Sequence, residues 1–249
     1  MVTARAPPAV APRVADPARV SIARLIRYGS AKPRARQTAS ARLTMQQEPL
    51  EFWFEFASTY SYLAASRIEE AAAAAGVRLR WRPFLLGPIF VSQGWGDSPF
   101  NIYPLKGRYM WRDMERLCEK YGLPFRRPSK FPRSGLLAAR VACMAAEEPW
   151  CPRFVRAVYR ANFAEDREIS QMETIAEILA TVGQSPREVL THAESPENKQ
   201  RLREQNQWAV VHGIFGAPTM LAGKELFWGN DRLEDAIAFH LHSQKTHAG

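Results

Sequence analysis

The pattern that most constrains the fold is a strand, a helix and a second strand within residues 50–84. Residues 50–56 read LEFWFEF, an alternating and aromatic-rich run that is typical of a buried strand. Ser58 then offers a favourable N-cap for a helix with one small and apolar face, and Gly76 is placed to end that helix. Residues 77–84 alternate again and predict a second strand. So short a span predicts a right-handed βαβ unit.

A related pattern returns near the C-terminus in the order strand, strand, helix. Residues 219–221 and 226–228 predict two short strands, and a helix follows from about Asn230, so this ββα segment covers about residues 215–243. Helical periodicity fills residues 104–212 between the two segments. A βαβ unit and a ββα unit separated by helices predict an α/β, thioredoxin-like fold with an inserted all-α helical subdomain.

The stretch that follows the second strand, residues 85–104, predicts a long structured loop. Gly and Pro punctuate it, and it carries Trp95, Phe100 and Tyr103. Connections of this length inside a compact domain are usually functional or disordered, and the aromatic residues favour a functional loop. We expect it to line an aromatic pocket.

Charge separates the chain into two parts. Residues 1–44 hold eight Arg, one Lys and one Asp, which is +8 of the total +9, and they are too poor in apolar residues to bury a core. We expect them to form a disordered basic extension, whose composition also resembles an organelle transit peptide. Residues 45–249 form the expected folded domain and are nearly neutral, so neither a nucleic-acid nor a membrane partner is predicted for it.

The cysteines and histidines predict no disulfide and no metal site. Cys118, Cys143 and Cys151 form an odd set without C-x-x-C spacing, and the five histidines lack metal-ligand spacing. We expect the first two cysteines to be buried and Cys151, which precedes a proline, to be exposed. This usage and the lack of a secretory signal pattern favour a cytoplasmic location.

Ser58 is the first candidate for chemistry because it lies where a strand gives way to a helix. Backbone N–H groups and the positive end of the helix macrodipole stabilise an anion at such a place, and a thiolate would suit it. The alternative is a serine that only caps the helix, which contributes about 1 kcal/mol of stability.

The second candidate is Pro218, which directly precedes the predicted strand at 219–221. It is either an ordinary residue at a strand start or the second residue of a cis Ala217–Pro218 bond. A cis bond here would turn the backbone groups of Ala217 toward a ligand.

Polar residues near the aromatic loop and the last helix are more ambiguous. Lys106 could bind a carboxylate, and Asn230 with Asp231 could bind a ligand amine. The alternatives are a solvated helix face for the first and a helix N-cap for the second.

Together these segments resemble the 2-hydroxychromene-2-carboxylate isomerase family, which is related to kappa-class glutathione transferases and DsbA-type oxidoreductases. The resemblance runs from about Phe52 to Leu241. It rests on four motifs: F-E-F-A-S-T-Y-S-Y-L-A from Phe54, S-P-F-N-I-Y-P-L-K-G-R-Y-M from Ser98, F-G-A-P-T-M from Phe215 and G-N-D-R-L from Gly229. Jointly these motifs are highly specific, although each is weak alone.

The resemblance implies glutathione as cofactor and a role for each matching position. Ser58 would be the catalytic residue and would hydrogen-bond the glutathione sulfur. The other implied cofactor-binding residues are Asn101, Lys106, Ala217, Pro218, Asn230 and Asp231, and the implied substrate-binding residues are Tyr60, Trp95, Lys106 and Arg108.

The resemblance also implies a reaction. The glutathione thiolate adds reversibly to a conjugated carbon of a small aromatic α-keto acid or its cyclic hemiketal, and the net result is isomerisation in aromatic catabolism. Ser58 and Ser61 stand where a C-x-x-C would be in redox relatives, so dithiol exchange is excluded. One departure is Thr59, where the family usually has proline, and it leaves the substrate open more than the fold.

Two other functions stay open at this point. A kappa-class-like glutathione transferase would leave the adduct attached, and a non-redox DsbA-like module would bind extended peptides beside Pro218. Relatives of this kind are often homodimers, so a homodimer is possible here.

Overall fold

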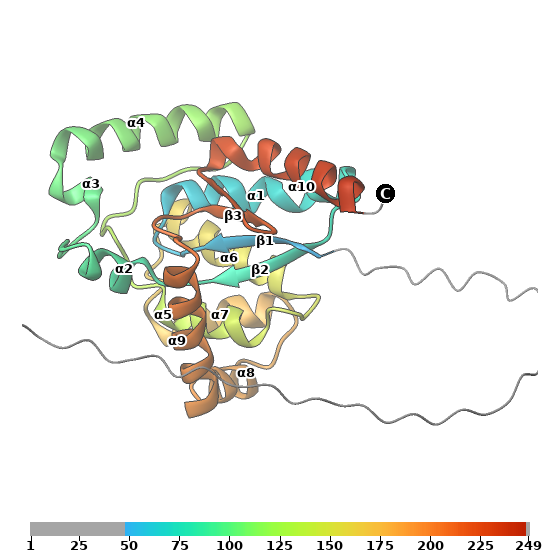
Figure 1. The fold of residues 1–249 in the computed structure, drawn as a ribbon. Coiled ribbons are helices and arrows are strands. Elements are labelled where there is room, and N and C mark those ends of the chain that lie inside the picture. The colour runs from blue at the N-terminus through green and yellow to red at the C-terminus, as the bar shows by residue number, and fades with distance from the viewer. Residues whose placement is uncertain (1–47, 248–249) are drawn as a thin grey trace, which may run out of the picture. The chain divides into compact units, whose positions relative to one another are not determined.

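A four-stranded mixed sheet forms the centre of the computed structural model, which describes residues 48–247 (Figure 1). The strand order is β2-β1-β3-β4, with β1 parallel to β2 and antiparallel to β3, and with β3 antiparallel to β4. The strands are β1 Leu50–Phe54, β2 Leu79–Pro83, β3 Thr219–Ala222 and β4 Glu225–Trp228. The basic extension expected at 1–44 lies outside the described residues.

The helices follow the predicted order, with α1 between the parallel strands and α10 at the end. Helices α2 to α9 lie between β2 and β3. The first two of them, α2 and α3, are short, and α4 and the helices α5 to α9 follow. The fold class predicted from the sequence is confirmed. The helices are α1 Thr59–Ala74, α2 Leu86–Ser92, α3 Pro99–Ile102, α4 Pro104–Tyr121, α5 Leu136–Met144, α6 Cys151–Phe163, α7 Met172–Thr181, α8 Pro186–Ala193, α9 Pro196–Val211, the 3-10 helix η1 Asn230–Arg232 and α10 Leu233–His247.

Alternation along β1 divides the core between the two faces of the sheet. Phe52 and Phe54 point to the face covered by α1 and α10, whereas Trp53 points to the face covered by α2 and α9 (Figure 1). Trp53 stacks in parallel on Trp208 of α9 with ring centroids 4.9 Å apart. The aromatic-rich strand therefore anchors helices on both sides.

The inserted helices share the hydrophobic core of the βαβ unit. Helix α6 packs against α1, and α5 packs against β2. Phe154 and Tyr159 of α6 belong to the same buried cluster as Phe54 and Phe56. Side chains of α6 therefore reach the end of β1, directly before Ser58.

Residues 85–104 are not one continuous loop, because α2 and α3 lie within them. Ser98 caps α3 by accepting the Phe100 N–H, and Pro99 occupies the first helical position. Residue types that break structure elsewhere begin a short helix here, which explains why the prediction was wrong.

The prediction for Cys151 was also wrong, because its side chain is buried. It occupies the first position of α6 and packs toward Ala142, with 3.9 Å between Sγ and the carbonyl oxygen. Cys118 and Cys143 are buried, as predicted.

Residues 48–247 contain neither a membrane-spanning helix nor a cluster of metal-ligating side chains. None of their helices combines the length and the apolar character that a membrane crossing requires. No group of three or more His, Cys, Asp or Glu side chains among them is arranged to hold a metal ion.

Candidate active site

Ser58 lies at the N-cap of α1, at the end of the turn that follows β1. Its backbone is extended, with φ −76° and ψ 117°, and its half-buried hydroxyl accepts the Ser61 N–H at 3.2 Å. The same hydroxyl donates to the Ala217 carbonyl oxygen at 2.9 Å. One hydroxyl thus joins the positive end of a helix to a segment 159 residues further along the chain.

The segment that Ser58 contacts precedes β3. The Ala217–Pro218 bond is cis, which the resemblance implied. Thr219 donates its hydroxyl to the Gly216 carbonyl at 2.9 Å, and the Gly229 N–H donates to the Pro218 carbonyl at 2.9 Å. These bonds hold the segment on both sides of the Ala217 carbonyl.

Side chains of α6 hold the turn between β1 and α1 from below. The Tyr159 hydroxyl donates to the Glu55 carbonyl oxygen at 2.9 Å, and Asn162 Nδ2 donates to the Phe56 carbonyl oxygen at 3.1 Å. Tyr159 and Asn162 are both buried. The backbone that carries Ser58 is therefore fixed by buried hydrogen bonds, which are costly to break.

A buried arginine supports Asn162 in turn. Arg133 Nη1 lies 3.2 Å from Asn162 Oδ1, and its guanidinium forms ion pairs with Asp166 and Glu168. The Ser129 N–H and the Arg133 guanidinium lower the pKa of Asp166 to about 2, so the carboxylate stays ionised beside its partner. This chain of polar contacts leads from the protein surface to the Ser58 turn.

Asn230 and Asp231 follow β4 and lie in η1, which contacts α1. Asn230 is 4% exposed, and its Oδ1 has no hydrogen-bond partner among the described residues. Asp231 is exposed and lies 3.4 Å from Arg232. Gly229 has a φ of 117°, and a Cβ there would lie 2.5 Å from Asp231 Oδ1, so only glycine allows this turn. A buried acceptor without a partner is a feature that a ligand could complete.

Tyr60 and Thr59 tie the first turn of α1 to α4. The Tyr60 hydroxyl donates to Asp113 Oδ2 at 3.0 Å, and burial together with the Asp113 charge raises the pKa of Tyr60 well above its usual range. The buried Thr59 hydroxyl lies 3.1 Å from the Met110 sulfur. The Thr59 hydroxyl is therefore directed at α4.

The remaining predicted residues lie on what we call the arm, residues 86–109, which comprises α2, α3 and the first turns of α4 (Figure 1). Trp95 packs on Phe90, and Asn101 Nδ2 donates to Asp97 at 3.0 Å and to the Phe131 carbonyl at 3.2 Å. The exposed side chains of Lys106 and Arg108 form no ion pair with any residue of 48–247. No hydrogen bond within that range joins these four residues to Ser58 or Ala217.

An aromatic pair beside the Ala217 segment was missed by the sequence analysis. Phe215 and Trp228 are about half exposed, with ring centroids 4.9 Å apart. A Cβ on Gly216 would lie 2.3 Å from Trp228 Nε1, so the indole packs against the bare backbone next to Ala217. Phe215 is part of the motif F-G-A-P-T-M, and Trp228 pairs with Thr219 across the hairpin. The pairing of Trp228 with Thr219 in the predicted hairpin was the signal that could have placed Trp228 beside the Ala217 segment.

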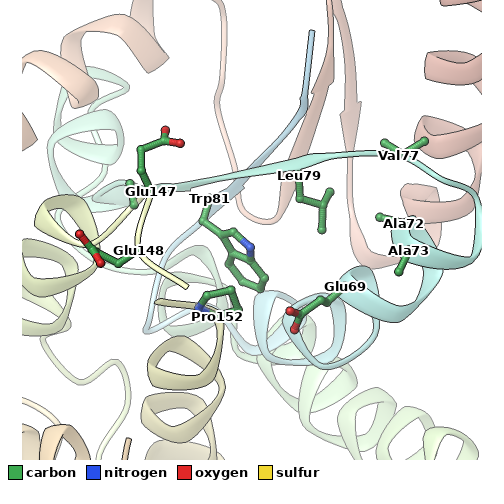
Figure 2. Close-up of a pocket in the computed structure, with 10 residues that line it drawn as sticks. Glu69, Ala72, Ala73, Val77, Leu79, Trp81, Glu147, Glu148 and Pro152 are labelled. Carbon is green, nitrogen blue, oxygen red and sulfur yellow. The ribbon is translucent and has the colours of Figure 1, made fainter. Parts of the chain in front are cut away.

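Two surface hollows differ in their relation to these residues. A cavity of about 330 Å³ on the arm is lined by Tyr103, Pro104, Leu105 and Lys106. Another, of about 320 Å³, lies at the free edge of β2 beside the C-terminal half of α1, and Trp81, Glu69 and Glu147 line it (Figure 2). Arg156 pairs with Glu69 and Arg80 with Glu147, and no predicted site residue lines this second cavity. Only the arm cavity contains a candidate residue.

Comparison with known families agrees with the observed fold. Residues 49–238 match the model of the DSBA-like thioredoxin domain. The chain therefore belongs to the family of DSBA-like thioredoxin domains.

Individual relatives place the chain more narrowly. It is 30% identical to a 2-hydroxychromene-2-carboxylate isomerase from Sphingobium xenophagum over 189 residues, which cover 74% of this chain and 94% of that protein. It is 26% identical to glutathione S-transferase kappa 2 from Caenorhabditis elegans, covering 76% of this chain and 90% of the relative. A solved structure of a 2-hydroxychromene-2-carboxylate isomerase superposes with a TM-score of 0.71 at 24% identity, over 81% of this chain and all of that one. The resemblance inferred from the motifs is confirmed.

Proposed function

We propose that this protein is a glutathione-dependent isomerase that acts on aromatic α-keto acids of the 2-hydroxychromene-2-carboxylate type. The observation that carries the proposal is the Ser58 hydroxyl, which sits at the N-cap of α1 and donates to the Ala217 carbonyl. Relatives named for this isomerase support the reaction, and relatives named as kappa-class glutathione transferases support the cofactor.

The residues around Ser58 fit a tripeptide that carries a thiol, an amine and two carboxylates. The α1 N-terminus favours a negative sulfur, and the unpartnered Asn230 Oδ1 with the exposed Asp231 carboxylate favours an amine. Lys106 and Arg108, free of acidic partners within residues 48–247, favour carboxylates of the tripeptide or of the substrate.

When bound, glutathione would supply a nucleophilic thiolate that adds reversibly to a conjugated carbon of the substrate. The task of Ser58 is to donate a hydrogen bond to that sulfur, which requires its hydroxyl to turn from the Ala217 carbonyl. Lowering a thiol pKa from about 8.5 toward neutrality requires roughly 2 kcal/mol, and one hydroxyl with a helix N-terminus can supply it.

The cysteines of the chain are unsuited to act in place of glutathione. All three are buried, and burial raises the pKa of Cys118 and of Cys151 to about 12. A thiol in such surroundings stays protonated and is a poor nucleophile. This supports a reaction in which the nucleophilic sulfur is brought by a bound molecule.

Two apolar surfaces could take the aromatic part of the substrate, one beside the Ala217 segment and one on the arm. Phe215 and Trp228 flank the Ala217 segment, and the arm cavity brings Tyr103 beside Lys106. A planar ring can stack on either surface, and Lys106 can pair with the carboxylate of a ring held in the arm cavity.

A kappa-class-like glutathione transferase is the second candidate, favoured by the kappa-class relatives. The same Ser58 geometry would serve it, but the adduct with glutathione would be released as product.

Product analysis separates the two candidates. The protein is incubated with 2-hydroxychromene-2-carboxylate and a limiting amount of glutathione, and both the isomer and the free thiol are measured. Many turnovers per glutathione with the thiol retained are the expected result. One thiol lost per turnover would make the protein a transferase, and turnover independent of glutathione would exclude both.

A further inference from the structure

A buried carboxyl group lies in the turn that leads to Ser58, and the proposed function does not use it. Glu55 precedes Ser58 by three residues and is 7% exposed. Its Oε2 accepts the Ala57 N–H at 2.9 Å. A Cβ on Gly135 would lie 3.5 Å from Oε1, so backbone closes the other side of the niche. The carboxyl is enclosed within one turn of the site.

No cation among the described residues compensates this carboxyl. The groups that face it are the Tyr159 hydroxyl from α6, which donates to the Glu55 backbone carbonyl, and the backbone N–H groups of Ala57 and Ser58. The buried Ser61 hydroxyl of α1 lies near Tyr159 without a well-formed hydrogen bond. A carboxylate enclosed without a cation is costly, so the neutral acid is favoured.

The pKa of Glu55 agrees with this geometry. Burial raises it to about 8, although the N–H groups of Ala57 and Ser58 pull it downward. The N–H of Ser58 donates to the Glu55 backbone carbonyl at 3.0 Å and also stabilises the nearby Glu55 carboxylate, while the Ser58 hydroxyl donates to the Ala217 carbonyl, beside which we propose that the sulfur binds. A carboxylate and a thiolate would compete for the same positive helix terminus.

We propose that Glu55 is a positioning residue that stays protonated beneath Ser58 so that the α1 N-terminus is free to accept the negative charge of a bound thiolate. This inference rests on the proposed function. The thiol proton leaves to solvent when the thiolate forms, and Glu55 keeps its own proton. Because coupling between two sites is reciprocal, a bound thiolate must raise the proton affinity of Glu55 by as much as an ionised Glu55 weakens thiolate binding.

An NMR titration tests the coupling. The chemical shift of the Glu55 carboxyl carbon, and that of the Ala57 amide that donates to it, are followed against pH for the free protein, with glutathione and with S-methylglutathione. Glutathione is expected to raise the titration midpoint by about one unit. S-methylglutathione is expected to leave it unchanged, because its sulfur carries no charge. Bound glutathione with no such difference would overturn the inference.

A matched pair of variants gives a second readout. The glutathione affinity of Glu55→Gln relative to that of the wild type is expected to increase as pH rises through about 8, because only the wild type gains a competing carboxylate there. Glu51→Gln is the control, since Glu51 lies on β1 but pairs with Arg82, and it is expected to behave as the wild type. Glutathione binding with a wild-type pH profile in Glu55→Gln would refute the role of Glu55 alone. Absence of any glutathione binding would instead refute the proposed function and this inference together, and the wild-type titration decides even if Glu55→Gln fails to fold.

Discussion

The turn that carries Ser58 and the arm that carries Lys106 differ in how the fold holds them. Buried side chains of α6 donate hydrogen bonds to two backbone carbonyls of the Ser58 turn. On the arm, the side chains of Ile102, Tyr103 and Leu105 are 39–75% exposed. A rigid group suits a sulfur that must meet one hydroxyl at a fixed place. An exposed and loosely packed group suits contacts with a substrate that can differ between relatives.

The largest expected effect concerns Ser58 and tests whether the turn that carries Ser58, rather than the arm, performs the chemistry. Ser58→Ala removes the side-chain donor at the α1 N-terminus that bonds to the Ala217 carbonyl. We expect glutathione-dependent kcat/KM to fall by about a hundredfold to a thousandfold, as for loss of one preorganised donor. The helix should also lose about 1 kcal/mol through its N-cap. Steady-state kinetics and thermal unfolding measure the two effects.

A second serine on the same helix provides the control for that experiment. Ser66 donates its hydroxyl to the Tyr62 carbonyl one turn away, and within residues 48–247 its side chain forms no hydrogen bond with a candidate residue. Ser66→Ala should retain the kinetics of the wild type. Equal losses in both variants would show that α1 and not its terminal hydroxyl matters.

The second prediction uses pH to compare buried and exposed carboxylates. The folded-state pKa of Glu55 is about 8, above its ordinary value of 4.5, so the folded protein binds more protons than the unfolded chain between these values. Stability contributed by the proton is complete below about pH 4.5 and is lost as pH rises through about 8. Between pH 5 and pH 8, we expect the unfolding free energy of Glu55→Gln to fall by roughly 3–4 kcal/mol less than that of the wild type.

Chemical denaturation at several pH values measures this slope. The same substitution at the exposed Glu70 should leave the slope of the wild type unchanged. Parallel curves for the wild type and Glu55→Gln would mean that Glu55 is ionised in the folded state.

The third prediction compares an Asn→Ala substitution that affects the Ser58 turn with one on the arm. Asn162 is 1% exposed and links Arg133 to the Phe56 carbonyl, whereas Asn101 is exposed on the arm. Asn162→Ala leaves buried partners unsatisfied and should cost about 2 kcal/mol of unfolding free energy. Asn101→Ala should cost less than about 0.5 kcal/mol, because water can replace its partners. Similar losses would mean that the arm is packed as firmly as the turn.

The Ser58 site and the arm also differ in how much of their structure the sequence predicts. Ser58 and the segment at Ala217 were predictable, because an N-cap, a proline and their flanking strands are local patterns. Asn162 lies 106 residues from the backbone it supports, so no local pattern marks it. On the arm, Pro and Gly fit either a loop or the start of a short helix, and the helix prevailed once Ser98 capped it. Structure that depends on neighbouring residues can be predicted from the sequence, whereas contacts between residues far apart in the chain cannot.

The smallest expected effect separates binding from stability at the two ends of α4. Lys106 and Lys120 are both exposed, and each ammonium lies 5.3 Å from the centroid of a tyrosine ring, Tyr103 or Tyr121. Their substitution by Ala should therefore change the unfolding free energy equally, by less than about 1 kcal/mol. Only Lys106 lines the arm cavity, so only Lys106→Ala should raise KM for the keto acid, by about tenfold, with kcat retained. An equal KM in both variants would show that the arm does not bind the substrate. A fall in kcat would instead show that Lys106 acts in the chemical step, together with the Ser58 turn.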